Sequence, residues 1–154
     1  MPDFQRRKKQ FLIYVLVWSL ALLVFSLLSH DMVWSVLPKE SFQSTAHVIA
    51  YGFLTYLLCF YLRFRRSMFK LRMTDVKVYV IACLLTITWG AVTELAQSLR
   101  LDRYGTWDDC FFDALGAVIG VIVFLSWQFR HHQHHTKKQK VKLDLKAFQT
   151  KAMD

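Results

Sequence analysis

The residues of this 154-residue chain that could do chemistry are ionisable side chains at the ends of long apolar stretches. Sixteen uncharged residues separate Lys77 from Glu94, and sixteen separate Asp113 from Arg130. At about 1.5 Å per residue in a helix, neither stretch crosses the roughly 30 Å of hydrocarbon in a bilayer. Glu94 and Asp113 are therefore expected inside the membrane, near one of its edges.

Charged groups inside a membrane usually face other helices and pair with partners there. We expect the partners among three polar residues at the same level, namely His47, Gln97 and Arg103. Carboxylates, an imidazole and a guanidinium supply both signs of charge, which suits binding of a head group or acid–base chemistry. The alternative is a polar cap in which Arg103 bridges Glu94 and Asp109 and only fixes the register of the helices.

Helices long enough to position these side chains are predicted by four apolar blocks. The chain is 55% hydrophobic and 16% aromatic, which is far more apolar than a soluble domain of this size. The blocks cover residues 10–29, 44–62, 76–97 and 109–129. We therefore predict an all-α fold, a four-helix transmembrane bundle, within a membrane domain of residues 1–129.

The basic residues predict the orientation of this bundle. Of the 20 Lys and Arg, all but Lys39, Arg100 and Arg103 lie in the amino-terminal tail, around the second connection or after the fourth block. The positive-inside rule then places both termini in the cytoplasm and the acidic cluster at the outer face. The basic stretch at 6–9 is interpreted as part of an uncleaved signal anchor. Residues 130–154 are predicted to form a His- and Lys-rich cytoplasmic tail attracted to anionic lipid, with loose metal binding as the alternative.

Two glycines indicate how the fourth helix packs. The face that carries Asp109 and Asp113 continues through Gly116 and Gly120. This small-xxx-small spacing lets another helix approach closely. The two carboxylates are therefore expected to point into the bundle.

Several function classes are disfavoured by what the sequence lacks. It contains no P-loop, no nucleophile elbow and no zinc-protease motif, and its three cysteines predict no disulfide framework. Nucleic-acid binding is not expected because the basic residues flank apolar spans. A transporter is disfavoured because charge is confined to the outer ends of the helices, whereas transporter sites lie near the midplane.

Enzymatic activity is not the leading expectation, and no cofactor or metal is assigned. The alternative is a membrane-embedded hydrolase or transferase acting on a lipid-linked substrate. In it, Glu94, Asp109 and Asp113 would hold a hard cation such as Mg²⁺ or Ca²⁺, and His47 would serve as acid or base.

The polar residues also follow a recognisable order along the chain. HVIAY is followed, after a basic loop, by ELAQSLRLDRYGTWDDCFFDALGAVIG, and together they resemble the VanZ-like family over residues 40–125. Asp113 stands where that family usually has Asn. An amide that can donate hydrogen bonds is thereby replaced by a carboxyl group that only accepts them unless it is protonated. Gln43 and Ser44 stand where relatives often carry an Asp-Lys pair. The matching positions are His47, Tyr51, Glu94, Gln97, Arg103, Thr106, Asp109, Gly116 and Gly120.

The resemblance implies a multi-pass protein of the bacterial cytoplasmic (inner) membrane, and the family's founding member is linked to low-level teicoplanin resistance. We expect a non-enzymatic cell-envelope factor whose outer polar site binds a lipid-linked or glycopeptide head group and affects antibiotic susceptibility. In this site Arg103 would bind anionic groups of the ligand, and Glu94 and Asp109 would hold the Arg103 side chain in place. The expected partners are membrane lipid and such a head group, but no nucleic acid. A homo-oligomer is left open because four short helices enclose little volume.

Overall fold

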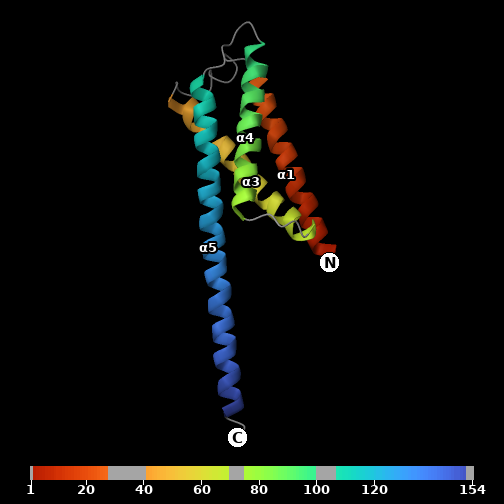
Figure 1. The fold of residues 1–154 in the computed structure, drawn as a ribbon, viewed down its shortest axis with the longest axis vertical. Helices are drawn as coiled ribbons and strands as arrows, with labels where there is room; N and C mark the ends of the chain where they lie inside the picture. The colour runs from red at the N-terminus through yellow and green to blue at the C-terminus, as the bar shows by residue number, and fades with distance from the viewer. Residues whose placement is uncertain (1, 28–40, 70–74, 100–106, 152–154) are drawn as a thin grey trace. The chain divides into compact units, whose positions relative to one another are not determined.

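Helices account for all regular structure in the part of the chain described here. The computed structural model describes residues 2–27, 41–69, 75–99 and 107–151, and within these it contains four helices and no strand. They are α1 (Pro2–Leu27), α3 (Ser41–Phe69), α4 (Asp75–Ser98) and α5 (Trp107–Lys151) (Figure 1). The predicted all-α fold is confirmed.

Each of these helices is long and apolar enough to cross a membrane. The spans are Lys9–Leu27, Ser44–Arg65, Asp75–Ser98 and Asp108–His131. They agree with the predicted blocks to within a few residues, except that residues 28 and 29 lie outside the described part. The chain thus has the architecture of a multi-pass membrane protein, whereas the cytoplasmic placement of both termini stays a prediction.

The distribution of side chains suits a lipid environment. Leu16, Val17 and Leu20 on α1 are each about 60% exposed, and similar apolar residues cover the outside of the other spans. The interior instead includes fully buried threonines, such as Thr55 and Thr86. Lipid removes the penalty for exposed apolar side chains, while the polar groups find partners between the helices.

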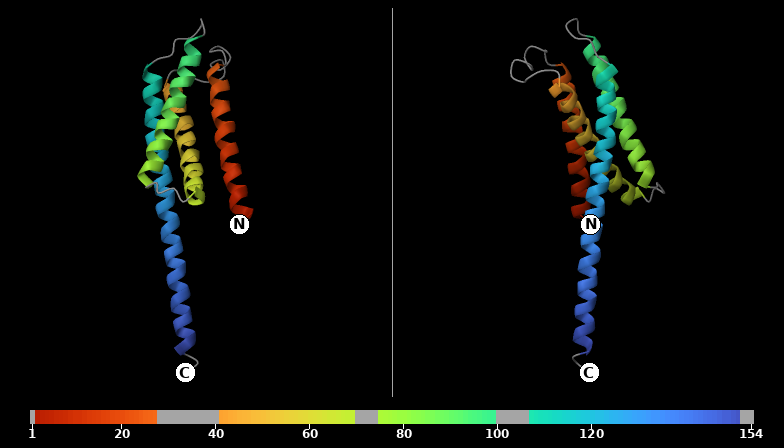
Figure 2. Two further views of the ribbon diagram at one scale, coloured as in Figure 1. Left: turned by 45° about the vertical axis from the view of Figure 1, so that its right-hand side comes forward. Right: turned by 90° about the vertical axis from the view of Figure 1, so that its left-hand side faces the viewer.

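The helices alternate in direction, which determines where their ends meet. Figures 1 and 2 show that α3 and α5 begin, and α4 ends, at one end of the bundle. We call this end the polar end. Residues far apart in sequence are therefore brought to one level, and the basic ends of α3 and α4 lie at the opposite end.

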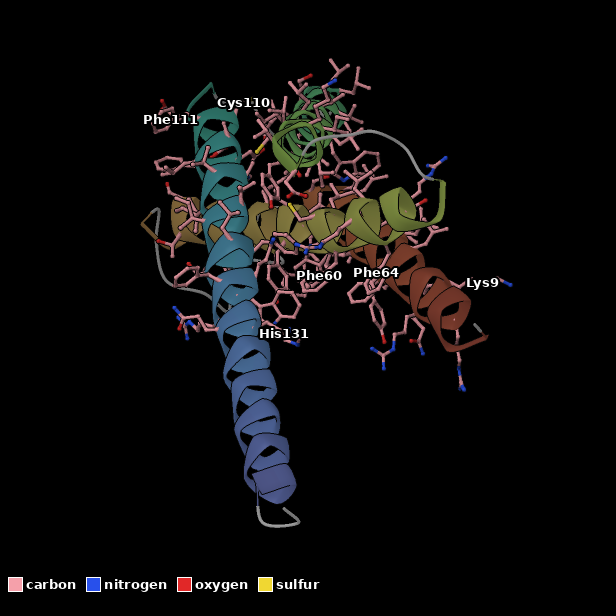
Figure 3. All side chains as sticks on the ribbon, turned by 60° about the horizontal axis from the view of Figure 1, so that its bottom comes forward. Lys9, Phe60, Phe64, Cys110, Phe111 and His131 are labelled. Carbon is pink, nitrogen blue, oxygen red and sulfur yellow. The ribbon has the colours of Figure 1, made fainter. Side chains whose placement is uncertain are left out.

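Aromatic side chains hold α1 against α3. The Phe11 ring stacks on Phe60 and Phe64, with ring centroids 5.1 and 5.3 Å apart. Figure 3 labels Phe60 and Phe64. Nearer the polar end, Trp18 Nε1 donates a hydrogen bond of 3.0 Å to the carbonyl oxygen of Ala50. The Trp18 ring also meets Phe53 edge-on at 4.9 Å. Helix α1 is thereby fixed along the length of α3.

The chain divides into two compact units, Met1–Ile122 and Val123–Asp154. The first contains α1, α3, α4 and the first part of α5, and therefore the whole polar end. The second contains the remainder of α5, where Trp127 packs on Phe124 and on His131 along the same helix. The predicted boundary between a membrane domain and a tail at residue 129 stays a prediction.

Candidate functional site

The centre of the polar end is a contact between His47 on α3 and Asp113 on α5. His47 Nδ1 lies 2.8 Å from Asp113 Oδ1, although 66 residues separate them in sequence. The Asp113 side chain is 1% exposed and the His47 side chain 18%. Because an ionised carboxylate can only accept, Nδ1 donates the shared proton when Asp113 is charged.

Helix α5 is rotated so that its acidic face points inward. Asp109 and Asp113 are 6% and 1% exposed, whereas Phe111 and Leu115, which alternate with them, are 65% and 40% exposed. In Figure 3, Phe111 accordingly projects away from the bundle. The apolar positions lie on the outside of the bundle, and the carboxylates lie between the helices.

Gly90 on α4 makes room for the Asp113 carboxylate. A Cβ atom at residue 90 would lie 2.5 Å from Asp113 Oδ2, which is too close for any side chain. Oδ2 itself is buried and has no hydrogen-bond partner among the described residues. One oxygen of Asp113 is therefore satisfied by His47, and the other lies against the bare backbone of α4.

Glu94 joins this contact from the next turn of α4. One ligand atom from each of His47, Glu94 and Asp113 can be chosen so that all three lie within 4.8 Å of one another. Glu94 is 7% exposed. These three residues, one from each of α3, α4 and α5, are called the three-helix cluster below.

Two further buried polar residues flank the three-helix cluster. Gln97 lies one turn beyond Glu94 and is 7% exposed, and Asp109 precedes Asp113 by one turn. The described part of the polar end thus combines three buried carboxylates with one imidazole, which makes it acidic and rich in hydrogen-bond acceptors.

A layer of hydroxyl groups supports the cluster from within the bundle. The Tyr51 hydroxyl lies 2.5 Å from Thr93 Oγ1, and the Tyr51 ring stacks on His47 with centroids 5.8 Å apart. Thr93 Oγ1 uses its hydrogen on the carbonyl oxygen of Gly90, at 2.8 Å. Tyr51 is therefore the donor to Thr93. The His47 ring is held by this stack and by its bond to Asp113.

The hydroxyl groups continue one turn further from the polar end. Thr55 Oγ1 lies 2.8 Å from Thr86 Oγ1 and 3.0 Å from the carbonyl oxygen of Tyr51. Thr86, Gly90 and Thr93 were not singled out from the sequence. Their helical spacing on the face of α4 that carries Glu94 and Gln97 is the signal that could have identified them.

Close packing of α3 on α5 brings His47 to Asp113. A Cβ at Gly116 would lie 2.6 Å from the carbonyl oxygen of Val48, and a Cβ at Gly120 would collide with the carbonyl oxygen of Gly52. Gly52 in turn faces the backbone of Gly116. Gly116 and Gly120 therefore lie at the crossing point of two helix backbones, and Gly52 is the matching residue on α3.

The structure brings together some of the predicted site residues. The cluster contains His47, Glu94 and Asp113, with Tyr51 stacked beneath His47. It differs from the cation-binding set expected from the sequence, because His47 takes the place of Asp109 among the atoms that lie close together. Arg103 and Thr106, and with them the expected bridge from Arg103 to Glu94 and Asp109, lie outside the described residues.

The fold and the site together define the class of this protein. It is a helical multi-pass membrane protein with a buried acidic site at one end of its bundle. The chain matches no protein-family model, no curated protein and no solved structure in comparisons with each.

Proposed function

We propose that this protein is a VanZ-like integral membrane protein of the bacterial envelope whose polar end binds the head group of a lipid-linked precursor or a glycopeptide. Binding would alter susceptibility to envelope-directed antibiotics. One observation carries the proposal, namely the convergence of ionisable side chains from three helices at the polar end. A cap that served only to fix helix register would need no unsatisfied carboxylate oxygen, yet Asp113 Oδ2 has no partner among the described residues.

The chemistry of the site favours a ligand that donates hydrogen bonds. Carboxylates accept but do not donate when ionised, and sugar hydroxyls, peptide N–H groups and ammonium groups are their natural partners. Gln97 can both donate and accept. In the proposal, Arg103 meets a phosphate or carboxylate on the same head group.

The proposed orientation puts both termini in the cytoplasm and the polar end at the outer face. The support is the sequence bias of Lys and Arg toward the other side of the membrane. We expect a topology reporter inserted after Lys70 to report a cytoplasmic position and one inserted near Gly105 to report an external position. Alkaline phosphatase, which is active only outside the cytoplasm, and a fluorescent protein, which fluoresces only inside it, together measure the position of each insertion. The reverse pattern would contradict the orientation.

The binding proposal is tested with a matched pair of carboxylates at the start of α5. Asp109 is buried, whereas its neighbour Asp108 is exposed. We expect Asp109→Asn and Glu94→Gln to weaken binding of a lipid-linked precursor to the protein in nanodiscs by at least tenfold, since each removes a charged acceptor worth roughly 1.5 to 3 kcal/mol. Asp108→Asn, with the same chemical change, should leave binding within twofold of wild type.

The same variants are then compared in cells for susceptibility to glycopeptide antibiotics. We expect cells with Asp109→Asn or Glu94→Gln to be as susceptible as cells without the protein. Cells with Asp108→Asn should be as susceptible as the wild type. Unchanged binding and unchanged susceptibility in all three variants would refute the proposed function.

A second candidate function is a metal-assisted hydrolase or transferase that acts on a lipid-linked phosphate. The observation that favours it is the close approach of one imidazole and two carboxylates, which are metal ligands as well as acids and bases. Turnover of a lipid-linked diphosphate by the purified protein would distinguish catalysis from binding alone.

A further inference from the structure

The three-helix cluster has the composition of a metal-ligand set. It offers one imidazole nitrogen and two carboxylate oxygens from His47, Glu94 and Asp113, with all three ligand atoms within 4.8 Å of one another. Ligand atoms around a divalent cation at about 2.0–2.2 Å lie roughly 3–3.5 Å apart. A separation at the 4.8 Å limit would have to shorten by roughly 1.3 to 1.8 Å to form a coordination shell, a movement within reach of carboxylate rotation.

The second oxygen of Asp113 provides independent evidence for a ligand. Oδ2 is buried without a hydrogen-bond partner among the described residues, in a side chain that is 1% exposed. It lies where Gly90 leaves space for it. Buried polar groups are normally satisfied, so an unpartnered carboxylate oxygen on a member of the three-helix cluster indicates a missing positive partner.

The charge of the three-helix cluster leads to the same conclusion. With His47 protonated, one positive and two negative charges leave the cluster with a net negative charge inside the membrane. With His47 neutral, a divalent cation balances the two carboxylates completely. Neutralising a buried cluster removes much of the penalty for placing ionised groups between helices.

We propose that His47, Glu94 and Asp113 bind one divalent transition-metal cation between α3, α4 and α5. Mixed nitrogen and oxygen ligands suit Zn²⁺ or Mn²⁺ better than Ca²⁺ or Mg²⁺, which prefer oxygen alone. Three protein ligands leave a coordination position for water or for an oxygen atom of a head group. When Nδ1 is the ligand, the cation takes the place of the Nδ1 proton. A protonated His47 releases that proton to solvent and keeps the one on Nε2, whereas in a neutral His47 the proton moves from Nδ1 to Nε2.

Zn²⁺ binding to the full-length protein tests the proposal. To keep the four histidines of the tail from contributing to Zn²⁺ uptake, the measurements use a full-length background in which His131, His132, His134 and His135 are replaced by Gln. After chelator treatment and dialysis into detergent, titration calorimetry should detect one Zn²⁺ per chain. X-ray absorption at the zinc edge should show a nitrogen and oxygen shell containing a single imidazole.

Variants then assign the ligands. His47→Ala, Glu94→Gln and Asp113→Asn should each weaken Zn²⁺ binding at least tenfold, and Asp108→Asn should not change it. Zn²⁺ should also raise the melting temperature of the tail-substituted background but not that of its Asp113→Asn derivative. Each variant is compared with itself, with and without Zn²⁺, so a difference in stability between the variants does not affect the result. Absence of Zn²⁺ and Mn²⁺ binding in this background, or equal affinity in all four variants, would overturn the proposal.

The cation site goes beyond the proposed function and is measured without any head group. A protein that binds Zn²⁺ but no lipid-linked precursor would support the site and refute head-group binding. A protein that binds the precursor but neither Zn²⁺ nor Mn²⁺ would support head-group binding and refute the cation site.

Discussion

Replacing His47 with leucine is expected to lower the free energy of unfolding by about 3 kcal/mol, because it leaves the buried Asp113 carboxylate without its hydrogen-bond donor. His47 Nδ1 lies 2.8 Å from Asp113 Oδ1, and Asp113 Oδ2 has no hydrogen-bond partner among the described residues. Asp113→Leu is expected to have a similar effect, since it leaves the imidazole facing an apolar side chain. Equilibrium unfolding in mixed micelles with a chelator present measures both changes.

The double variant His47→Leu/Asp113→Leu separates this interaction from the packing of each side chain. If the two residues stabilise each other, the double variant should be more stable than the sum of the single effects predicts. Side-chain hydrogen bonds in membrane proteins couple by up to about 1.7 kcal/mol, and a charged bond belongs at the upper end of that range. Additive effects would contradict a direct interaction.

Enlarging Gly120 to leucine is expected to be equally disruptive for a different reason. Even a Cβ atom at this position would collide with the backbone of Gly52 and lie 3.0 Å from the Cβ of Thr55. Backbone atoms cannot rotate away, so α3 and α5 must separate, at a cost near the upper end of about 1 to 3 kcal/mol. A lower melting temperature in detergent would record this loss.

A control on the lipid side of α5 tests whether this effect comes from helix packing. Val118 is 52% exposed and lies between Gly116 and Gly120, so Val118→Leu adds bulk to the same helix without meeting another. Its stability should stay within about 0.5 kcal/mol of the wild type. Equal destabilisation by Val118→Leu and Gly120→Leu would show that bulk on α5, rather than contact with α3, is responsible.

The four membrane spans could be predicted because their signal is local. An uninterrupted apolar block of about 20 residues has few alternatives to a transmembrane helix, whatever its neighbours. The place of Glu94 and Asp113 near one end of their helices could be predicted for the same reason, since it depends only on the distance from Lys77 and Arg130 along each helix. The glycine spacing on α5 likewise indicated a close contact, although not with which helix.

The pairing within the polar end depends on how each helix is rotated about its axis, which a single sequence does not specify. His47, Gln97 and Arg103 were all candidate partners of the carboxylates. The described structure joins His47 to Asp113, whereas Arg103 lies outside the described residues. That contact requires Gly90 on α4, because any side chain at residue 90 would occupy the space of the Asp113 carboxylate. Thr93 was overlooked similarly, because a threonine in a transmembrane helix commonly bonds to its own backbone. Only the position of Tyr51 reveals its second role.

The origin of the three-helix cluster from α3, α4 and α5 has a consequence for biosynthesis. Asp113 follows His47 by 66 residues. At roughly 5 to 20 residues per second, a ribosome makes the partner of His47 about 3 to 13 s after His47 itself. During that interval α3 has neither Asp113 nor the glycines of α5 against which it will pack. The site is completed only when the last helix enters the membrane, so a chain that stalls after α4 has most of its spans but no cluster.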